Sequence, residues 1–217
     1  MKLLTFETDA GPAVGAIAAD GESVVDLTAA GVAPGMNELI ARGVEGLASA
    51  RVAVAEAGSE VHPLSACRVL APIVRPLRNI ICVGKNYYEH ANEFHNSGFD
   101  AAADKTAVPE FPIFFTKATT SVIAAGDPIP ASSDPTRSVD YEGELAVILG
   151  LGGRGIPRNR AFDHVFGYAN LNDVTARALQ RRHNQWFLGK SLDGFCPFGP
   201  YIVTADSAGD VGVVFPP

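Results

Sequence analysis

Three carboxylates stand at alternate positions in the stretch SVDYEGELAVILG, which runs from Ser138 to Gly150. Successive side chains of a β-strand point to opposite faces, so Asp140, Glu142 and Glu144 would project to one side of a strand built from this stretch. Like charges at that spacing repel unless a cation lies between them, and carboxylate oxygens suit a hard divalent ion such as Mg²⁺ or Mn²⁺. The other interpretation is a solvent-facing edge strand whose acidic side chains discourage aggregation.

A second group of polar residues follows the apolar segment GYANL, in the stretch NDVTARALQRRH. We predict that Asn172 and Asp173 start a helix here, which would place Arg177 and either Gln180 or Arg181 on the same face as Asp173. A carboxylate at such a corner between strand and helix could be a third metal ligand, with Arg177 and Gln180 facing a bound anion. The same residues also fit a plain helix cap with an ion pair four positions apart.

The segment ICVGKNYYEHANEF adds a pair of residues suited to proton transfer. Asn86 can cap a helix that carries His90 and Glu93 on one face, one turn apart. A glutamate in that position fixes the tautomer of the imidazole and favours its protonated form, so the two residues would make a general-base pair. A surface histidine beside a glutamate is the alternative interpretation.

These groups need a scaffold, and the chain divides into two parts. Short alternating strands followed by a helical stretch predict a small N-terminal domain over residues 1–74. Prolines around Arg75 interrupt the chain, and the continuous apolar run RNIICVG is typical of a buried strand, so we predict a catalytic domain over residues 75–217. The predicted N-terminal strands are KLLTFET, AVGAIAA and SVVDL, and the helical stretch is MNELIARGVEGLASARVAVAEA.

Composition excludes several classes of protein. The 217 residues are 47% hydrophobic and 19% charged, which describes an ordinary globular protein. The net charge is −7 and the basic residues are scattered, which argues against nucleic acid as a partner. No apolar run approaches the roughly 20 residues of a membrane span. The three cysteines lie far apart and lack metal-type spacing, which fits reduced thiols, so we expect a cytoplasmic protein. The lack of a long apolar run leads us to expect that it binds no membrane.

Four motifs follow one another in the order GKNYYEHANEF, DYEGELAVILG, NDVTARALQ and WFLGKSLDGFCPFGP. In this order and spacing, from about Arg75 to about Ala205, the chain resembles the fumarylacetoacetate hydrolase family, in its bacterial branch similar to acylpyruvate and fumarylpyruvate hydrolases. The resemblance implies an α+β fold, with a mixed, rolled β-sheet as the catalytic domain beside a small N-terminal α+β domain. It also implies a homodimer.

The resemblance implies roles for the residues described above. The implied metal ligands for Mg²⁺ or Mn²⁺ are Glu142, Glu144 and Asp173, so that the cation offsets their repulsion. Asp140 would lie outside the ligand set. The implied catalytic residues are His90 and Glu93, which would activate water, and Lys190, which would stabilise a developing oxyanion. The implied substrate-binding residues are Arg177 and Gln180.

A lysine near the predicted pocket and the C-terminal end of the sequence need separate interpretation. Lys117, in FFTKATTSV, could face the pocket, but we expect a strand-end lysine whose ammonium reaches solvent. After GPYIVTAD the family would continue through further strands and a Gly/Thr-rich turn, whereas this chain ends in SAGDVGVVFPP. We therefore expect the C-terminal part of the catalytic domain to be incomplete.

The resemblance implies a metal-dependent hydrolase that cleaves a carbon–carbon bond in acylpyruvate-type β-diketo acids, of the kind formed in aromatic catabolism. On the same site, decarboxylation of oxaloacetate or isomerisation or hydration of a hydroxymuconate-type dienoate stays open. A catalytically inert protein that binds a metal or an oxo acid is the alternative from another class. We expect the turn-rich segment from Asn96 to Glu110 to influence which substrate is bound.

Overall fold

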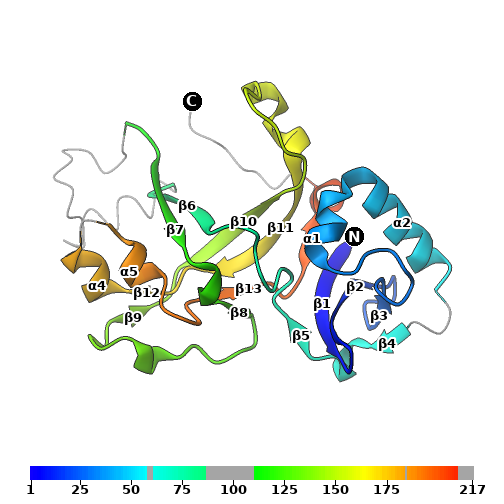
Figure 1. Ribbon diagram of the computed structural model, residues 1–217, viewed down its shortest axis with the longest axis horizontal. Helices are drawn as coiled ribbons and strands as arrows, with labels where there is room; N and C mark the ends of the chain where they lie inside the picture. The colour runs from blue at the N-terminus through cyan, green and yellow to red at the C-terminus, as the bar shows by residue number, and fades with distance from the viewer. Residues whose placement is uncertain (58–60, 87–109, 184, 210–217) are drawn as a thin grey trace.

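The structure of the chain is a computed structural model that describes residues 1–57, 61–86, 110–183 and 185–209. Its main feature is a strongly curled mixed sheet of ten strands with short helices beside it (Figure 1), so the predicted α+β class is confirmed. The strand order is β4-β3-β2-β1-β14-β11-β13-β8, with β10 paired to β11 and β5 paired to β1. The strands of this sheet are β1 (Lys2–Thr8), β2 (Gly11–Ile17), β3 (Ser23–Asp26), β4 (Val61–Pro63), β5 (Val69–Leu70), β8 (Val122–Ala124), β10 (Gly143–Leu149), β11 (Val165–Asn172), β13 (Cys196–Phe198) and β14 (Ile202–Thr204).

The N-terminal strands form because their apolar side chains are buried on both faces of the sheet. On β1, Leu3 joins the main hydrophobic core with residues of helices α1 (Met36–Ala41) and α2 (Gly43–Ala55). Leu4 and Phe6 belong to a second, smaller cluster. The three predicted N-terminal strands are confirmed to within two residues at each end.

The predicted single helical stretch is two helices. The break comes at Gly43, the first residue of α2, whose backbone takes a φ of +52°, in the left-handed region that favours glycine. Arg42 ends α1, and its guanidinium donates to the carbonyl of Val32 and to Ser49 Oγ, the latter at 3.1 Å. The chain therefore turns between the two helices while both keep contact with the core.

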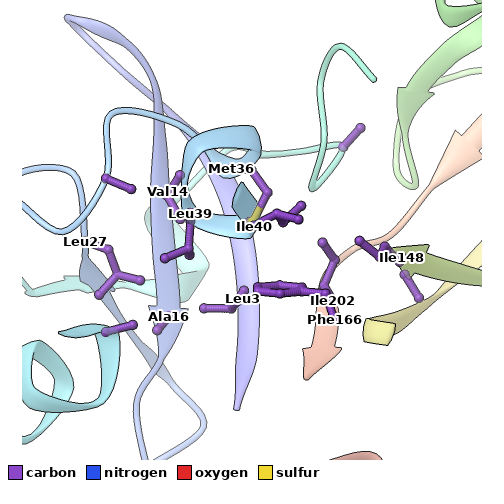
Figure 2. Packing of buried hydrophobic residues seen from close by; sticks show 14 of the residues in the cluster. Leu3, Val14, Ala16, Leu27, Met36, Leu39, Ile40, Ile148, Phe166 and Ile202 are labelled. Atoms are coloured by element: carbon purple, nitrogen blue, oxygen red, sulfur yellow. The ribbon is translucent and has the colours of Figure 1, made fainter. Parts of the chain in front are cut away.

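The main core joins the two halves of the sequence. Figure 2 shows Leu3 of β1 beside Phe166 of β11 and Ile202 of β14, with Ile148 of β10 close by. Strand β1 also pairs antiparallel with β14, in a register that sets Leu3 opposite Ile202. The sheet thus runs across the predicted boundary at residue 75, and that boundary stays a prediction.

A separate two-stranded sheet carries part of the site. It pairs β6 (Ile80–Gly84) with β7 (Ile113–Lys117), and Val83 lies opposite Phe114. The strand predicted in RNIICVG is confirmed. The prediction that this strand is buried is wrong, because 69% of Ile81 and 39% of Val83 is exposed. The burial alternates along β6, with Ile80, Cys82 and Gly84 half-buried and Ile81 and Val83 exposed, so only one face of this strand packs against the protein.

The three cysteines are free thiols, as the sequence predicts. Burial raises the pKa of Cys82 and of Cys196 to about 12, and the negative charge of Asp173 adds to the effect at Cys82. Both groups are therefore protonated at neutral pH, which removes them as nucleophiles. No helix in the described parts of the chain is long and apolar enough to cross a membrane.

Candidate active site

Strand register brings two of the predicted metal ligands together. Strands β10 and β11 pair antiparallel with Gly143 opposite Asn172. Glu142 directly precedes β10 and Asp173 directly follows β11, so the two residues lie side by side at the same end of this ladder. The amide of Asp173 donates to the carbonyl of Glu142 at 2.8 Å, and the amide of Glu142 donates to Asn172 Oδ1 at 3.0 Å. These bonds extend the ladder by one step and hold the two carboxylates beside each other.

Glu142 and Asp173 direct one oxygen each at the same cationic group. Lys190 Nζ lies 2.6 Å from Glu142 Oε2 and 2.7 Å from Asp173 Oδ2, and we call these two atoms the inner oxygens. Lys190 ends the short helix α5 (Phe187–Lys190), and only 2% of its side chain is exposed. Burying an ammonium group costs free energy unless anions pair with it, and the carboxylates of Glu142 and Asp173 provide that pairing for Lys190.

The second oxygen of each carboxylate is held by a different cation. Asp173 Oδ1 lies 2.7 Å from Lys117 Nζ, and Glu142 Oε1 accepts a hydrogen bond from Arg177 Nη1. We call these two atoms the outer oxygens. The contacts to the outer oxygens thus fix the orientation of both carboxylates, so that their inner oxygens point toward Lys190.

Arg177 begins helix α4 (Arg177–Arg182) and connects two acidic residues. Besides Glu142, it binds Asp140 Oδ2 through Nη2 at 2.9 Å and through Nε at 3.0 Å. Burial lowers the pKa of Arg177, but the carboxylates of Glu142 and Asp140 raise it more, so the pKa lies above its ordinary value. Gln180, one turn on, is buried and its Oε1 lies 3.3 Å from Arg177 Nη1.

Two sequence predictions about this region are wrong. Asp173 does not start a helix, because β12 (Thr175–Ala176) follows it and α4 begins only at Arg177. The alternative interpretation, a helix cap with an ion pair between Asp173 and Arg177, is not found either, since the described ion pairs of Arg177 go to Asp140 and Glu142. Asp140 does not belong to β10, the strand that carries Glu144 and that begins one residue after Glu142. It belongs to β9 (Val139–Asp140), which pairs with β12 and thereby brings Asp140 to Arg177.

Lys117 is also placed differently from the prediction. The last residue of β7 does not reach solvent: 0% of it is exposed, and its ammonium faces Asp173. The alternation of β7 explains this, because Lys117 shares a face with Phe115, two residues before it. That face turns toward α5, where Phe115 lies beneath Lys190 Nζ at 5.1 Å from the ring centroid.

A pocket of about 390 Å³ opens onto these groups. Its polar side includes Glu142, Glu144, Asp173, Gln180 and Lys190. Its apolar side includes side chains that the sequence did not single out, such as Phe115 and Trp186, whose rings meet edge to face at 5.4 Å. Apolar walls with a few converging polar groups are typical of small-molecule sites.

Glu144 keeps its predicted side of the strand. Along β10 the odd-numbered residues from Gly143 to Leu149 are exposed and the even-numbered ones are more protected, so Glu144 shares the face of Ala146. It lines the same pocket as Glu142 and Asp173. The alternation expected of the two glutamates is therefore confirmed.

The donor set fits a divalent cation in its chemistry. The inner oxygens already converge on one positive centre, and an all-oxygen site suits Mg²⁺ or Mn²⁺. Glu142, Asp173 and Glu144 are the residues that would hold the ion. Within the described residues no three His, Cys, Asp or Glu side chains are arranged as a metal site, and the ammonium of Lys190 contacts both Glu142 and Asp173.

The predicted dyad of His90 and Glu93 lies outside the described residues, as do the segment from 96 to 109 and the C-terminal residues 210–217. Their roles stay predictions. The described part of the site sits on one side of the sheet: β7, β9, β12, α4 and α5 lie beyond β10 and β11, away from the N-terminal strands and α2 (Figure 1).

The order of these elements and the site residues match a known family. The family model described as "Fumarylacetoacetate (FAA) hydrolase C-terminal" matches residues 79–214. The chain belongs to the fumarylacetoacetate hydrolase family. The match begins close to the predicted start of the catalytic domain and includes Glu142, Glu144, Asp173 and Lys190.

Three relatives show the range of this family. Oxaloacetate tautomerase YisK of Bacillus subtilis is 46% identical over 152 residues, which is 70% of this chain and 48% of that protein. A fumarylacetoacetate hydrolase from Exiguobacterium antarcticum is similar in structure, with a TM-score of 0.69 and 42% identity, over 95% of this chain and 67% of that one. A maleylpyruvate hydrolase from Sphingobium sp. SYK-6, solved with manganese (II) ion and pyruvate, has a TM-score of 0.69 and 29% identity over 97% and 69%. The chain spans about half the length of the tautomerase that it matches.

Proposed function

We propose that the chain is a hydrolase that depends on Mg²⁺ or Mn²⁺ and cleaves a carbon–carbon bond in acylpyruvate-type β-diketo acids. The observation that carries this proposal is the pair of inner oxygens of Glu142 and Asp173, which converge on one cationic centre in a pocket with an apolar side. We also propose a cytoplasmic location, which the three free thiols support.

The residues divide the chemistry among them. A divalent cation held by Glu142, Glu144 and Asp173 would act as a Lewis acid on the 2-oxo group of the substrate. Lys190 donates a hydrogen bond to the oxygen on which negative charge develops, and its burial strengthens that interaction. Water attacks the other carbonyl as His90, oriented by Glu93, takes its proton. The bond from that carbonyl carbon to the methylene carbon then breaks, which releases a carboxylic acid and the enolate of pyruvate, and the enolate takes up a proton.

Oxaloacetate tautomerisation is the second candidate, and the 46% identity with a Bacillus subtilis oxaloacetate tautomerase favours it. This reaction needs the same cation and the same stabilisation of an enolate by Lys190. It needs no attacking water. The two candidates therefore differ in their demand on the dyad of His90 and Glu93.

An assay on purified protein tests both reactions. With an acylpyruvate panel and Mg²⁺ or Mn²⁺, we expect the diketo absorbance to fall as pyruvate appears, and chelator to stop both. In His90→Ala, hydrolysis should fall about 10²- to 10⁴-fold, the usual contribution of a general base. Binding of Mn²⁺ should persist in this variant because His90 is not among the proposed ligands.

The matched control is His183→Ala, since His183 is exposed at the end of α4. It should keep the parental rate. Wild-type hydrolysis in His90→Ala would reject the dyad. If no acylpyruvate is cleaved but the enol form of oxaloacetate is converted faster with metal, and this survives in Glu93→Gln, the tautomerase candidate replaces the hydrolase. If neither substrate class is converted, the result favours a catalytically inert protein that binds a metal or an oxo acid.

A homodimer is our proposal for the quaternary state, supported by an exposed apolar face of the β6–β7 sheet, part of which also lines the pocket described above. Ile81, Val83 and Phe114 share that face and are 69%, 39% and 64% exposed. Contiguous apolar surface of this kind marks interaction sites. Light scattering after size exclusion should give twice the chain mass for the parent and a shift toward monomer for Phe114→Glu. Val44→Glu, at a position on α2 that is 82% exposed and so more open than Phe114, should remain dimeric, and a monomeric parent would contradict the proposal.

A further inference from the structure

We propose that Lys117 is a positioning residue, which fixes the outer oxygen of Asp173 so that this carboxylate presents a single oxygen to the bound cation. The inference rests on the proposed metal site and adds to it a residue that touches neither substrate nor metal. It predicts that Asp173 binds the ion through Oδ2 alone.

The burial of Lys117 is the first observation. None of its surface is exposed, and moving an ammonium from water to the protein interior is costly unless its protons are all accepted. Lys117 Nζ donates to Asp173 Oδ1 at 2.7 Å, to the carbonyl of Val174 at 3.0 Å and to the carbonyl of Lys190. An ammonium has three donors, so this one is fully used.

The three acceptors come from segments that must be placed relative to one another. Asp173 and Val174 follow the end of β11, whereas Lys190 is the last residue of α5. One ammonium at the end of β7 therefore fixes the Asp173 carboxylate and the backbone from which the Lys190 side chain starts. A plain ion pair would need the carboxylate alone, and the two carbonyls show that the lysine sets geometry as well as charge.

Arg177 occupies the corresponding place behind Glu142. It holds the outer oxygen of Glu142 as Lys117 holds the outer oxygen of Asp173, and the inner oxygens meet between them. A carboxylate whose outer oxygen is held cannot rotate to offer both oxygens to one ion. Such partners of ligating groups fix ligand orientation in metal sites generally.

Two variants test the role of Lys117 through binding of Mn²⁺, followed by electron paramagnetic resonance of the full chain. Lys117→Met removes the charge and keeps the shape, while Lys117→Arg keeps the charge but cannot place donors on the same three acceptors. We expect both to weaken Mn²⁺ affinity by about 10- to 100-fold, the usual effect of removing a partner of a metal ligand. A changed Mn²⁺ line shape should accompany the loss, because the freed carboxylate can bind through both oxygens.

Ser191→Ala is the matched control. Ser191 Oγ accepts from the amide of Ala118 at 3.1 Å, so it ties the same end of β7 to the end of α5 without touching Asp173. This variant should bind Mn²⁺ as the parent does, and thermal unfolding would establish that each protein is folded.

The outcomes separate the inference from the function on which it rests. Parental or tighter Mn²⁺ binding in Lys117→Met would overturn the inference, because the lysine would then act only as an opposing charge. Should the Met variant not fold, parental affinity and line shape in Lys117→Arg would overturn it equally. A parent protein that binds no Mn²⁺ would instead overturn the metal site of the proposed function.

Discussion

Asp173→Asn is expected to lower the free energy of unfolding by about 3–5 kcal/mol, the usual cost of removing one partner from a buried ion pair. Asp173 is the carboxylate shared by Lys117 and Lys190, and only 4% of its side chain is exposed. Without it, Lys117 keeps two carbonyls as acceptors but no anion. Chemical denaturation would measure the change, and Mn²⁺ binding should be lost in the same variant.

Asp163→Asn is the control for this loss. Asp163 forms an ion pair with Arg160 at 3.0 Å, but both side chains are more than half exposed. Exposed pairs contribute about 0–1 kcal/mol, so the control should unfold close to the parent. Equal stability of the two variants would show that the contacts of Asp173 carry little free energy and would contradict its proposed place at the centre of the site.

Lys190→Met should lower the turnover number by about 10²- to 10³-fold, which is typical of removing a group that stabilises a developing oxyanion. Affinity for Mn²⁺ should not fall, because the ammonium lies on the inner oxygens of Glu142 and Asp173 and competes with the ion for them. Steady-state kinetics on the cleaved substrate, together with a Mn²⁺ titration, would measure both quantities.

This expectation is opposite in direction to that for Lys117, whose loss should weaken metal binding. Lys2→Met, at an exposed position on β1, is the control and should change neither quantity. A parallel loss of Mn²⁺ affinity and turnover in Lys190→Met would mean that Lys190 organises the carboxylates, and the oxyanion role would then be abandoned.

Much of the local structure could be predicted from the sequence. The alternation of apolar and polar residues correctly predicted the N-terminal strands, and it correctly placed Glu142 and Glu144 at alternate, more protected positions at the start of β10. The order of four motifs identified the family, which the match over residues 79–214 confirmed. These signals are local, because side-chain direction in a strand depends on a period of two residues.

The errors concern contacts between distant residues. The pair Asn172 and Asp173 predicted a helix start, but pairing of β12 with β9 delays the helix by four residues. Lys117 was predicted to end its strand with the ammonium in solvent. Its position two residues after Phe115, on the same face of β7, was a signal that the side chain could point inward. Helix caps and strand ends are short-range preferences, and tertiary contacts override them.

The sequence by itself determined which residues could form the site, the faces of the strands that carry them and the family to which the chain belongs. Only the tertiary structure decided which cation meets which carboxylate: Lys117 and Asp173 are 56 residues apart, and Lys190 and Glu142 are 48 apart. The physical reason is that charge pairing depends on distance and burial in three dimensions, whereas sequence patterns report only the direction of each side chain from its own element.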